Sequence, residues 1–533
     1  MFLSSSDRFS LPGFRLPAPD ALAELHRYDA FDWCILVPYF AVLITLSIYG
    51  FYRYVVLIQY WRQPKKSSES GMPASELLPL PRVTIQLPIY NERYVVERLL
   101  EAVTAIEYPK DRLQIQVLDD STDDTTSLAA RLAALYERQG VPIEYRHRSD
   151  RTGFKAGALQ DGLESATGEL IAIFDADFLP PRDFLHRTVA FFNDPSVGVV
   201  QTRWSFENLR ENLLTEVQGL LLDAHFALEH EARYRQRAFF NFNGTGGILR
   251  RKMIEDAGGW QHDTLTEDAD LSYRAQLRGW RFVYEHTIEC PSELPADMRS
   301  FQVQQFRWAK GLTQVAVKLL PKILRAPIPL RQKVETFIYL TPNVCYPLTV
   351  VLSALVVPAT IVRFSVGWFQ MLTVDVPLIA TSFLPICIFY VLAAREVHPH
   401  KWSRAILLLP VLMAVGIGLA ISNTKAFCEA VLGVQTEFVR TPKFAAQGRV
   451  SVPKRDQAWR VDWVLAIEFG LGIYFAGALV FELSRANYGC VPFLMLFLAG
   501  FLGTSLSTLY QRTRDSIWRK RLNVGAWVHA KGH

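Results

Sequence analysis

The sequence lacks the cysteine pattern of a zinc-bound or disulfide-bound protein. Its 533 residues include six cysteines, and no two are close enough to form a CxxC pair. Structural zinc sites and dithiol redox centres depend on such pairs. Most of the cysteines lie in or beside apolar segments, where the thiol behaves as a small hydrophobic group. We therefore expect no disulfide framework.

Strong charge is missing as well. The formal net charge is +5, and only 20% of the residues are charged. The first 300 residues contain no compact Lys/Arg run interleaved with aromatic residues, so we expect no nucleic-acid partner. The opening MFLSSSDRFSLPGF has neither a basic start nor an apolar core. We therefore expect no cleaved signal peptide.

Apolar residues are abundant and make up 50% of the chain. That share and the length favour two or three units, one of them in a membrane. Residues 33–60 form an apolar stretch about one bilayer long. Arg62, Lys65 and Lys66 follow it. The positive-inside rule then places this end in the cytoplasm and residues 1–30 outside.

Five more apolar segments follow the soluble part, at 334–362, 366–394, 404–430, 462–483 and 489–510. If all five crossed, the basic loop 437–461 and the basic tail would lie outside, against the positive-inside rule. The segment 404–430 carries Asn423, Lys425 and Glu429, so we expect it not to cross. Five spanning helices remain. Residues 302–325 alternate apolar and basic groups, which predicts an interfacial amphipathic helix.

Between these parts, residues 83–300 have the pattern of an α/β domain. We expect strands at 83–90, 113–120, 143–147, 171–178 and 197–204, and helices at 92–105, 122–139 and 182–192. Such alternation predicts a mostly parallel sheet. Ligands of these sheets bind beyond the carboxyl ends of the strands. Asp119, Asp120, Asp175 and Asp177 all fall at such ends.

The stretch IAIFDADFLP (171–180) carries two of these acids. In an extended chain Asp175 and Asp177 would project to one side, and two close carboxylates need a positive partner. One interpretation is Mg²⁺ or Mn²⁺ bridging the acids to a diphosphate. The alternative is a solvated Asp-x-Asp turn.

Other groups allow similar pairs of interpretations. Asp119 and Asp120 could bind a nucleoside or cap the next helix. Lys155, among small residues, could hold phosphate oxygens or lie on the surface. Glycines in FNFNGTGGILRR (240–251) allow close approach to a ligand or make a simple turn.

Two helices could carry reacting groups. In TLTEDADLSYRAQLRGW (264–280), Asp268 could act as a general base. The acids there could instead favour the helix dipole, with Thr266 as the cap. Gln304, Arg307 and Trp308 share one helical face. They could bind a diphosphate and a sugar ring, or anchor the helix at a membrane surface.

Taken in order, these residues resemble a known series. Asp120, Asp175-x-Asp177, Thr266-Glu267-Asp268 and Gln304-x-x-Arg307-Trp308 resemble the D, DxD, TED and QxxRW motifs of membrane-bound family 2 glycosyltransferases. LDDSTDDT, KAGAL, FDADF, FNGT and AGGW are similar to the cellulose synthase-like branch that makes glucans and mannans. The resemblance implies a GT-A domain fused to a transmembrane region. EFVRTPKF (437–444) resembles the cytoplasmic gating loop of cellulose synthases, with Arg440 where those enzymes have Val.

The resemblance also implies roles. Asp268 would be the catalytic base, with Glu267 beside it. The donor nucleotide sugar would be held by Asp120, Asp119, Glu92, Lys155, Asp175, Gln304 and Arg307. The metal, Mg²⁺ or Mn²⁺, would bind Asp175 and Asp177. Trp308, Asn243, Gly244 and Thr245 would meet the acceptor, and the gating loop would use Phe438, Thr441, Pro442 and Lys443.

From these roles we expect an inverting, processive synthase of a β-linked glucan or mannan that moves its product across the membrane. UDP-glucose is the first candidate donor and GDP-mannose the second. The alternatives are a lipid glycosyltransferase similar to ceramide or diacylglycerol glucosyltransferases, and a transporter or scaffold with a degenerate nucleotide-binding domain. The resemblance implies a multi-pass protein of a bacterial inner membrane with a cytoplasmic catalytic domain.

The expected division of the chain has eight parts. They are an extracytoplasmic segment and first span (1–62), a linker (63–82), the catalytic domain (83–300), interfacial helices (301–330), transmembrane or interface helices (331–436), the gating-like loop (437–461), two spans (462–511) and a basic cytoplasmic tail (512–533).

Overall fold

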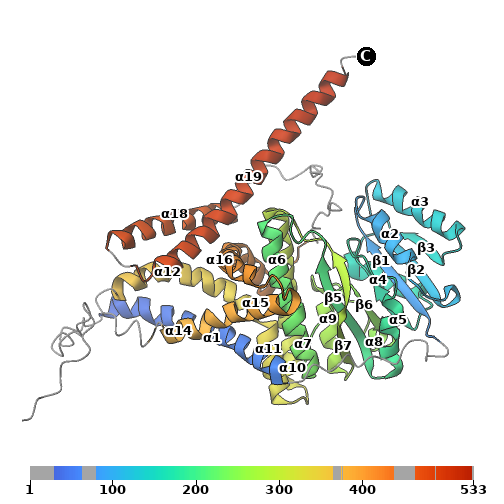
Figure 1. The fold of residues 1–533 in the computed structure, drawn as a ribbon, viewed down its shortest axis with the longest axis horizontal. Helices are drawn as coiled ribbons and strands as arrows, with labels where there is room; N and C mark the ends of the chain where they lie inside the picture. Colours follow the sequence, from blue (N-terminus) through green and yellow to red (C-terminus); the bar gives the residue numbers. More distant parts are fainter. Residues whose placement is uncertain are drawn as a thin grey trace, which may run out of the picture.

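A computed structural model describes residues 29–62, 80–363, 374, 376–436, 463–485 and 488–514, and the backbone alone of 515–530. The gating-like residues Phe438, Thr441, Pro442 and Lys443 lie outside the described residues. In Figure 1 the strands gather in one part of the molecule and long helices fill the other. The α/β part carries most of the predicted site residues, and Gln304, Arg307 and Trp308 lie on the helix that follows it.

The α/β part is built on one seven-stranded sheet of order β3-β2-β1-β4-β6-β5-β7. β6 is antiparallel to both of its neighbours, and the other pairings are parallel. The expectation of a mostly parallel sheet is confirmed. The strands are β1 Val83–Ile89, β2 Leu113–Asp119, β3 Ile143–His147, β4 Leu170–Ile173, β5 Val197–Phe206, β6 Gly247–Arg250 and β7 Arg281–Ser292.

The direction of β6 determines which loops meet. Ile173 at the end of β4 pairs with Gly247 at the start of β6. The loop that precedes β6 therefore lies at the carboxyl end of the parallel strands, together with the loops that follow β1, β2 and β4. If β6 were parallel to β4, that loop would lie at the opposite end of the strands.

Helices cover both faces of the sheet because side chains alternate along each strand. On β4, Leu170 and Ala172 join the core on one face, while Ile171 and Ile173 join the core on the other. The first face is covered by α2 (Val96–Thr104), α3 (Thr125–Arg138) and α5 (Phe184–Thr188), and the second by α4 (Phe154–Ser165), α8 (Arg251–Asp256) and α9 (Glu267–Leu277). Short 3₁₀ turns occur at Lys110–Arg112 and Val189–Asn193.

Several expected elements end at different residues. The strand predicted at 171–178 stops at Ile173, because the amide of Phe178 bonds to the carbonyl of Asp175 and closes a turn. The helix predicted at 182–192 is divided into α5 and a 3₁₀ turn. β6 and β7 were not predicted.

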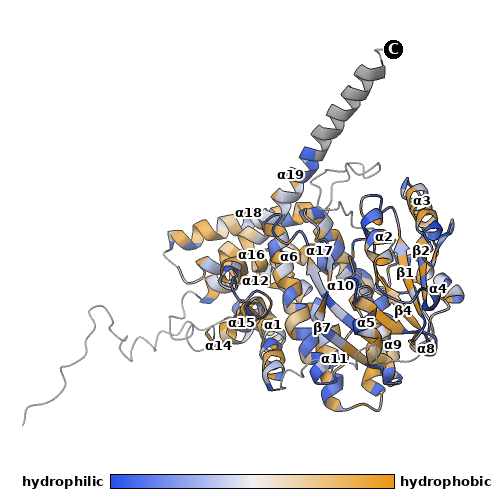
Figure 2. Ribbon diagram, turned by 45° about the vertical axis from the view of Figure 1, so that its right-hand side comes forward, coloured by the Kyte–Doolittle hydropathy of each residue, from blue (hydrophilic) through white to orange (hydrophobic). Residues whose placement is uncertain are grey.

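The helical part contains α1 (Ala30–Arg62) and the helices after the sheet. These are α10 (Met298–Arg325), α11 (Leu330–Leu340), α12 (Cys345–Arg363), α14 (Val376–Ser382), α15 (Leu384–Val397), α16 (Ser403–Gly418), α17 (Ala420–Val431), α18 (Trp463–Ser484) and α19 (Val491–Ala530). Within the sheet domain, α6 (Leu213–Ala224), a π-helix (His225–His230) and α7 (Glu231–Arg235) form one continuous rod. Figure 2 shows that apolar residues dominate the long helices.

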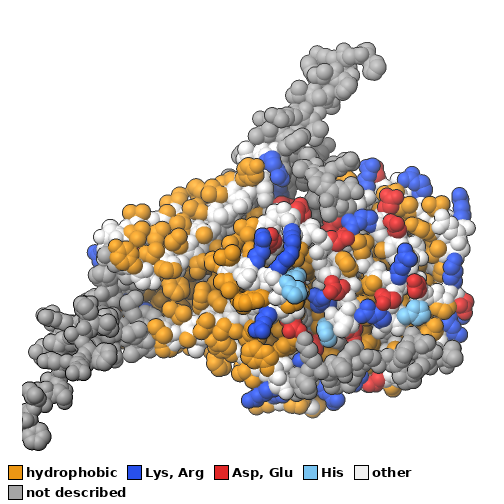
Figure 3. Space-filling view, viewed as in Figure 1, with side chains coloured by type: hydrophobic (Ala, Val, Ile, Leu, Met, Phe, Trp, Pro, Cys, Tyr) orange, Lys and Arg blue, Asp and Glu red, His pale blue; other side chains and the backbone are white. Residues whose placement is uncertain are grey.

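Five helical stretches among the described residues are long and apolar enough to cross a membrane: Ala30–Arg62, Pro342–Arg363, Val376–Val397, Trp463–Ser484 and Val491–Arg514. α16 and α17 could form a sixth, but the pair bends by 46°. This bend falls inside the segment 404–430, which we expected not to cross. Figure 3 shows apolar side chains over these helices and charged ones over the sheet domain.

One apolar segment expected to cross the membrane contains a break, and its candidate span begins at Pro342. The apolar segment 334–362 is not one helix, since α11 ends at Leu340 and a 3₁₀ turn begins at Pro342 before α12. Proline disfavours a helical conformation at the residue before it and cannot donate a backbone hydrogen bond. The break therefore follows from the Thr341-Pro342 sequence.

Candidate active site

The two metal-binding candidates lie in a turn. Asp175 and Asp177 follow the end of β4, and the amide of Asp175 donates to the Thr245 hydroxyl at 2.8 Å. The extended arrangement expected from the sequence is therefore wrong. Asp177 is instead held by the residue that follows β7, because the amide of Glu293 donates to its Oδ2 at 3.4 Å.

A lysine is the positive partner of this acid pair. Lys155 Nζ lies 2.5 Å from Asp175 Oδ1 and 3.8 Å from Glu267 Oε1. It also donates to the Gly244 carbonyl at 2.9 Å. Burial would lower the pKa of Lys155, but the carboxylates of Asp175 and Glu267 outweigh it and raise the pKa. Lys155 therefore stays charged at the centre of the site, as expected of a phosphate-binding group.

The acid pair also fits a divalent cation. Magnesium and manganese prefer carboxylate oxygens. Among the described residues no group of three or more His, Cys, Asp or Glu side chains is arranged to hold a metal. Two carboxylates are nevertheless enough where phosphate oxygens of a substrate and water complete the coordination. Asp175 and Asp177 are the residues that would hold such an ion.

The proposed base lies next to this lysine. Asp268 is half-buried in the first turn of α9. Burial, and then the charge of Glu267, raise the pKa of Asp268 to about 7. A carboxylate with such a pKa can accept a proton near neutral pH. Thr266 does not cap the helix as expected, since its hydroxyl makes no capping bond.

Helix α10 brings a cation to the same acids. Burial lowers the pKa of Arg307, while the charges of Glu267, Asp175, Asp268 and Asp177 act in the opposite direction. The close approach depends on Gly311, one turn further along. A Cβ atom there would lie 2.5 Å from Thr266 Cγ2. The glycine thus lets α10 pack directly against the start of α9.

The nucleoside candidates are held firmly at the end of β2. Arg148 binds Asp120 through two bonds, Nε to Oδ1 at 2.8 Å and Nη2 to Oδ2 at 2.6 Å. Asp119 is fully buried and accepts from the Tyr145 hydroxyl at 2.7 Å and the Ser121 amide at 2.9 Å. Asp119 therefore shapes the loop, and Asp120 sits beside it with a bound guanidinium.

The acceptor candidates precede β6. Gly244 has a φ of +81°, and a Cβ there would lie 2.8 Å from Asp268 Oδ2. Thr245 is buried and holds Asp175, as described above. The side chain of Asn243 bonds to Asn241 at 2.8 Å and to His230 at 3.1 Å. Asn243 and Thr245 therefore hold this loop in place around Gly244.

The π-helix connects this loop to α1. His230 Nε2 lies 3.2 Å from the Asn241 carbonyl, and burial lowers the pKa of His230 well below its usual value, so the ring is neutral. Its neighbour Glu229 pairs with Arg53 of α1 at 3.2 Å. π-Helical turns often occur at functional sites. Here the turn links a candidate membrane span to the loop that precedes β6.

The structure brings together Lys155, Asp175, Asp177, Gly244, Glu267, Asp268 and Arg307. Glu92 lies after β1, and its carbonyl accepts the amides of Val95 and Val96. Gln304 and Trp308 are half-buried on the same helix as Arg307.

Sequence reasoning missed three functional supports. Arg148 and His230 were not identified, because their partners come from other elements. Glu293 was not identified either, because the bond from its amide to Asp177 joins residues 116 positions apart. A half-buried arginine such as Arg148, opposite an aspartate at the end of another strand, leaves no periodic signal in the sequence.

Comparisons with known proteins show the family to which the chain belongs. Residues 81–311 match the family profile described as glycosyltransferase-like family 2. The probable glucomannan 4-beta-mannosyltransferase 9 of Oryza sativa subsp. japonica is 33% identical over 446 residues, which are 80% of this chain and 82% of that protein. The chain belongs to the cellulose synthase-like branch of the family 2 glycosyltransferases.

Two further members of the family match more locally. Glucomannan 4-beta-mannosyltransferase 1 of Oryza sativa subsp. japonica is 40% identical over 53% of this chain and 56% of its own length. Glucomannan 4-beta-mannosyltransferase 2 of Arabidopsis thaliana is 39% identical over 55% of this chain and 56% of its own length. The chain thus spans about half the length of these two relatives.

Among solved structures, a mannosyltransferase of Pyrobaculum calidifontis in complex with GDP-Man and Mn²⁺ aligns with a TM-score of 0.47 and 23% identity. The alignment covers 68% of this chain and 99% of that one.

Proposed function

We propose that the protein is an inverting hexosyltransferase that extends a β-linked polysaccharide from a nucleotide sugar. One observation carries this proposal. Lys155, which contacts Asp175 at 2.5 Å, also bonds to the carbonyl of Gly244, and Gly244 lies against Asp268. A phosphate-binding group, a metal-binding acid and a base with a pKa of about 7 therefore meet at one point.

The geometry supports a direct displacement. Asp268 accepts the proton of an acceptor hydroxyl, and the hydroxyl oxygen bonds to the anomeric carbon of the donor. The bond between that carbon and the diphosphate oxygen breaks, so an α-linked donor gives a β-linked product. Lys155 and Arg307 offset the charge that develops on the departing diphosphate. A divalent ion on Asp175 and Asp177 would supply further charge neutralisation when bound.

We propose mannose as the transferred sugar and GDP-mannose as the donor. The relatives are named glucomannan 4-beta-mannosyltransferases. Their names favour GDP-mannose over UDP-glucose as the donor. They also favour a growing glycan over a lipid as the acceptor. The helices around the catalytic domain support transfer of the product across the membrane. The basic residues after α1 support a cytoplasmic position for that domain.

The test is a donor panel. The purified protein is incubated with GDP-mannose or UDP-glucose in the presence of Mn²⁺ or Mg²⁺, with Asp268→Asn as the control. We expect release of GDP and a polymer that a β-mannanase degrades, both abolished by chelation of the metal. Release of UDP with a glucanase-sensitive polymer would replace mannose by glucose. A small, lipid-dependent product would overturn the polymer synthase in favour of a lipid glycosyltransferase.

A further inference from the structure

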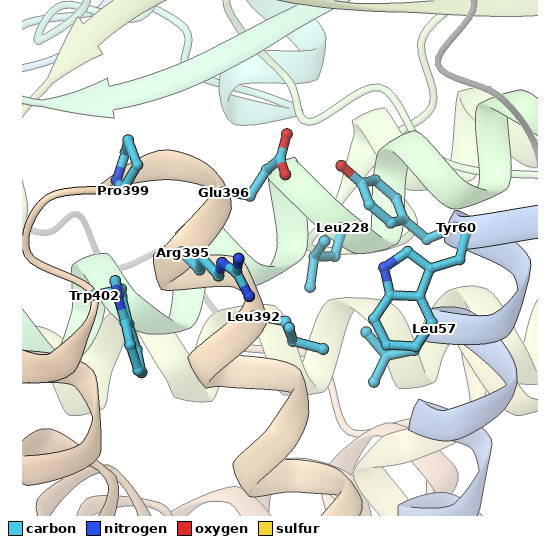
Figure 4. Close-up of a pocket in the computed structure, with 9 residues that line it drawn as sticks. Leu57, Tyr60, Leu228, Leu392, Arg395, Glu396, Pro399 and Trp402 are labelled. Carbon is cyan, nitrogen blue, oxygen red and sulfur yellow. The ribbon is translucent and has the colours of Figure 1, made fainter.

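A cavity outside the active site lies where the helical part meets the catalytic domain. Its volume is about 710 Å³, within the usual range for small-molecule sites. Leu57, Tyr60 and Trp61 of α1 form one side, and Leu392, Arg395 and Glu396 of α15 form the other. Figure 4 shows these walls facing each other. Leu228 of the π-helix closes the cavity toward the sheet domain.

The cavity lies at the ends of two candidate spans. α1 ends at Arg62 and α15 ends at Val397, so both helices leave the apolar layer here. Trp61 and Trp402 line the cavity and are 60% and 38% exposed. Exposed tryptophans next to cations are typical of the boundary between hydrocarbon and headgroups. A ligand here would have its apolar part in the bilayer and its polar part outside.

The charged residues that line the cavity indicate which polar group a ligand would carry there. Arg395 is exposed, and within the described part of the chain its guanidinium has no hydrogen-bond or ion-pair partner. Glu396 instead interacts with the hydroxyl of Tyr60. In Figure 4 Arg395 lies between Leu392 and Trp402, away from that pair. A guanidinium in this setting binds phosphate oxygens through its fork of donors.

We propose that this cavity binds a membrane phospholipid. The phosphate lies on Arg395, and the acyl chains run along Leu57 and Leu392 into the bilayer. Because Arg395 and Glu396 both line the cavity, a zwitterionic headgroup such as phosphoethanolamine complements the lining better than a purely anionic one. The lipid would contact Leu228, and therefore the catalytic domain. This inference does not depend on the proposed transferase activity.

The test compares two amphiphiles with the same chains. The delipidated protein in detergent receives palmitoyl-oleoyl phosphatidylethanolamine or palmitoyl-oleoyl glycerol, and native mass spectrometry counts the retained molecules. The variants are Arg395→Glu and Arg395→Gln. Lys401→Glu is the matched control, since Lys401 is an exposed cation close to the cavity but outside its lining. The thermal unfolding midpoint of each variant establishes that it is folded.

We expect the protein to retain the phospholipid and not the glycerolipid. A charge-assisted hydrogen bond contributes about 1.5–3 kcal/mol, so both Arg395 variants should weaken retention at least about tenfold. Lys401→Glu should leave it unchanged. Equal retention of the two amphiphiles, or undiminished retention by folded Arg395 variants, would overturn the proposal.

Discussion

Lys310 on α10 and Glu429 on α17 form an ion pair of 2.7 Å, and Lys310 is completely buried. Lys310 also donates to the Thr436 hydroxyl at 2.9 Å. It follows Arg307 and Trp308 by less than one turn. Helix α10 carries the diphosphate-binding candidates. The ion pair therefore connects this helix to α17, the second helix of the bent pair α16–α17.

Replacing Lys310 with Met should destabilise the protein. Breaking a fully buried ion pair costs about 3–5 kcal/mol, and the loss should be smaller here because Glu429 is 19% exposed and Lys425 lies 3.9 Å from it. We expect a clear fall in the thermal unfolding midpoint in detergent. Lys322→Met, an exposed lysine on the same helix, should cause little change. The double variant Lys310→Met/Glu429→Gln should recover part of the loss, and additive effects would contradict this pairing.

Asp268→Asn should abolish transfer without abolishing donor binding. An amide cannot accept the proton of the acceptor hydroxyl, and general bases contribute about 10²–10⁴-fold to rates. We expect a loss in kcat of that size, measured as nucleoside diphosphate release. The affinity for the nucleotide, measured by calorimetry, should change by less than about threefold. Unchanged turnover would rule out Asp268 as the base.

Activity should fall as the pH drops below about 7. Transfer requires the Asp268 carboxylate, whose pKa is raised to about 7 by burial and then by Glu267. In Glu267→Gln one of these causes is removed, so the Asp268 pKa should fall. The acid limb of the kcat/KM profile should then move to lower pH, whatever the absolute rate. Glu255→Gln, an exposed residue on α8, should leave the limb in place.

Gly244→Ala should reduce transfer more than backbone strain alone explains. The glycine has a φ of +81°, and an added Cβ would lie 2.8 Å from the Asp268 carboxylate. Gly279 provides the control, because its φ is +91° and no atom lies within 4 Å of an added Cβ. Both substitutions carry a similar conformational penalty. We expect an activity loss of at least about tenfold only for Gly244→Ala, while equal losses would argue against a role for the approach to Asp268.

Gly311→Ala should disturb the site from the opposite side. A Cβ there would lie 2.5 Å from Thr266, which would push α10 away from α9. Arg307 would move with the helix, so the KM for the donor should rise. Gly416→Ala, another helical glycine with nothing within 4 Å of an added Cβ, should keep the wild-type KM. A normal KM in Gly311→Ala would show that the contact tolerates a methyl group.

The end of β2 was predicted well from the sequence, whereas β4 stops five residues before the predicted end. Asp119 and Asp120 follow an apolar run, and β2 ends at Asp119 as such a run indicates. β6 is only four residues long and follows two glycines with positive φ, so it lacks a periodic signal. Its position between β4 and β5 arises from pairing with distant strands. The contact between Gly244 and Asp268 could therefore not be predicted from local sequence patterns.

Motif spacing proposed which residues belong to the site, but it did not indicate what each one contacts. Lys155 was expected at a phosphate, and in the structure it bonds to Asp175 and Gly244. Thr245 was expected at the acceptor, yet its hydroxyl holds the Asp175 amide. Such contacts join residues 20 to 89 positions apart. They depend on the sheet order, which a single sequence does not encode in any local window.

The reversed direction of β6 has a consequence for engineering. The acids proposed to hold the donor come from the ends of β2 and β4, whereas the segment proposed to face the acceptor enters from the start of β6. The two sets of residues therefore lie on separate stretches of chain. Exchanging residues 239–243 for those of a relative should therefore alter acceptor choice and keep donor choice, because Gly244 and Thr245, which bond to Lys155 and Asp175, stay in place.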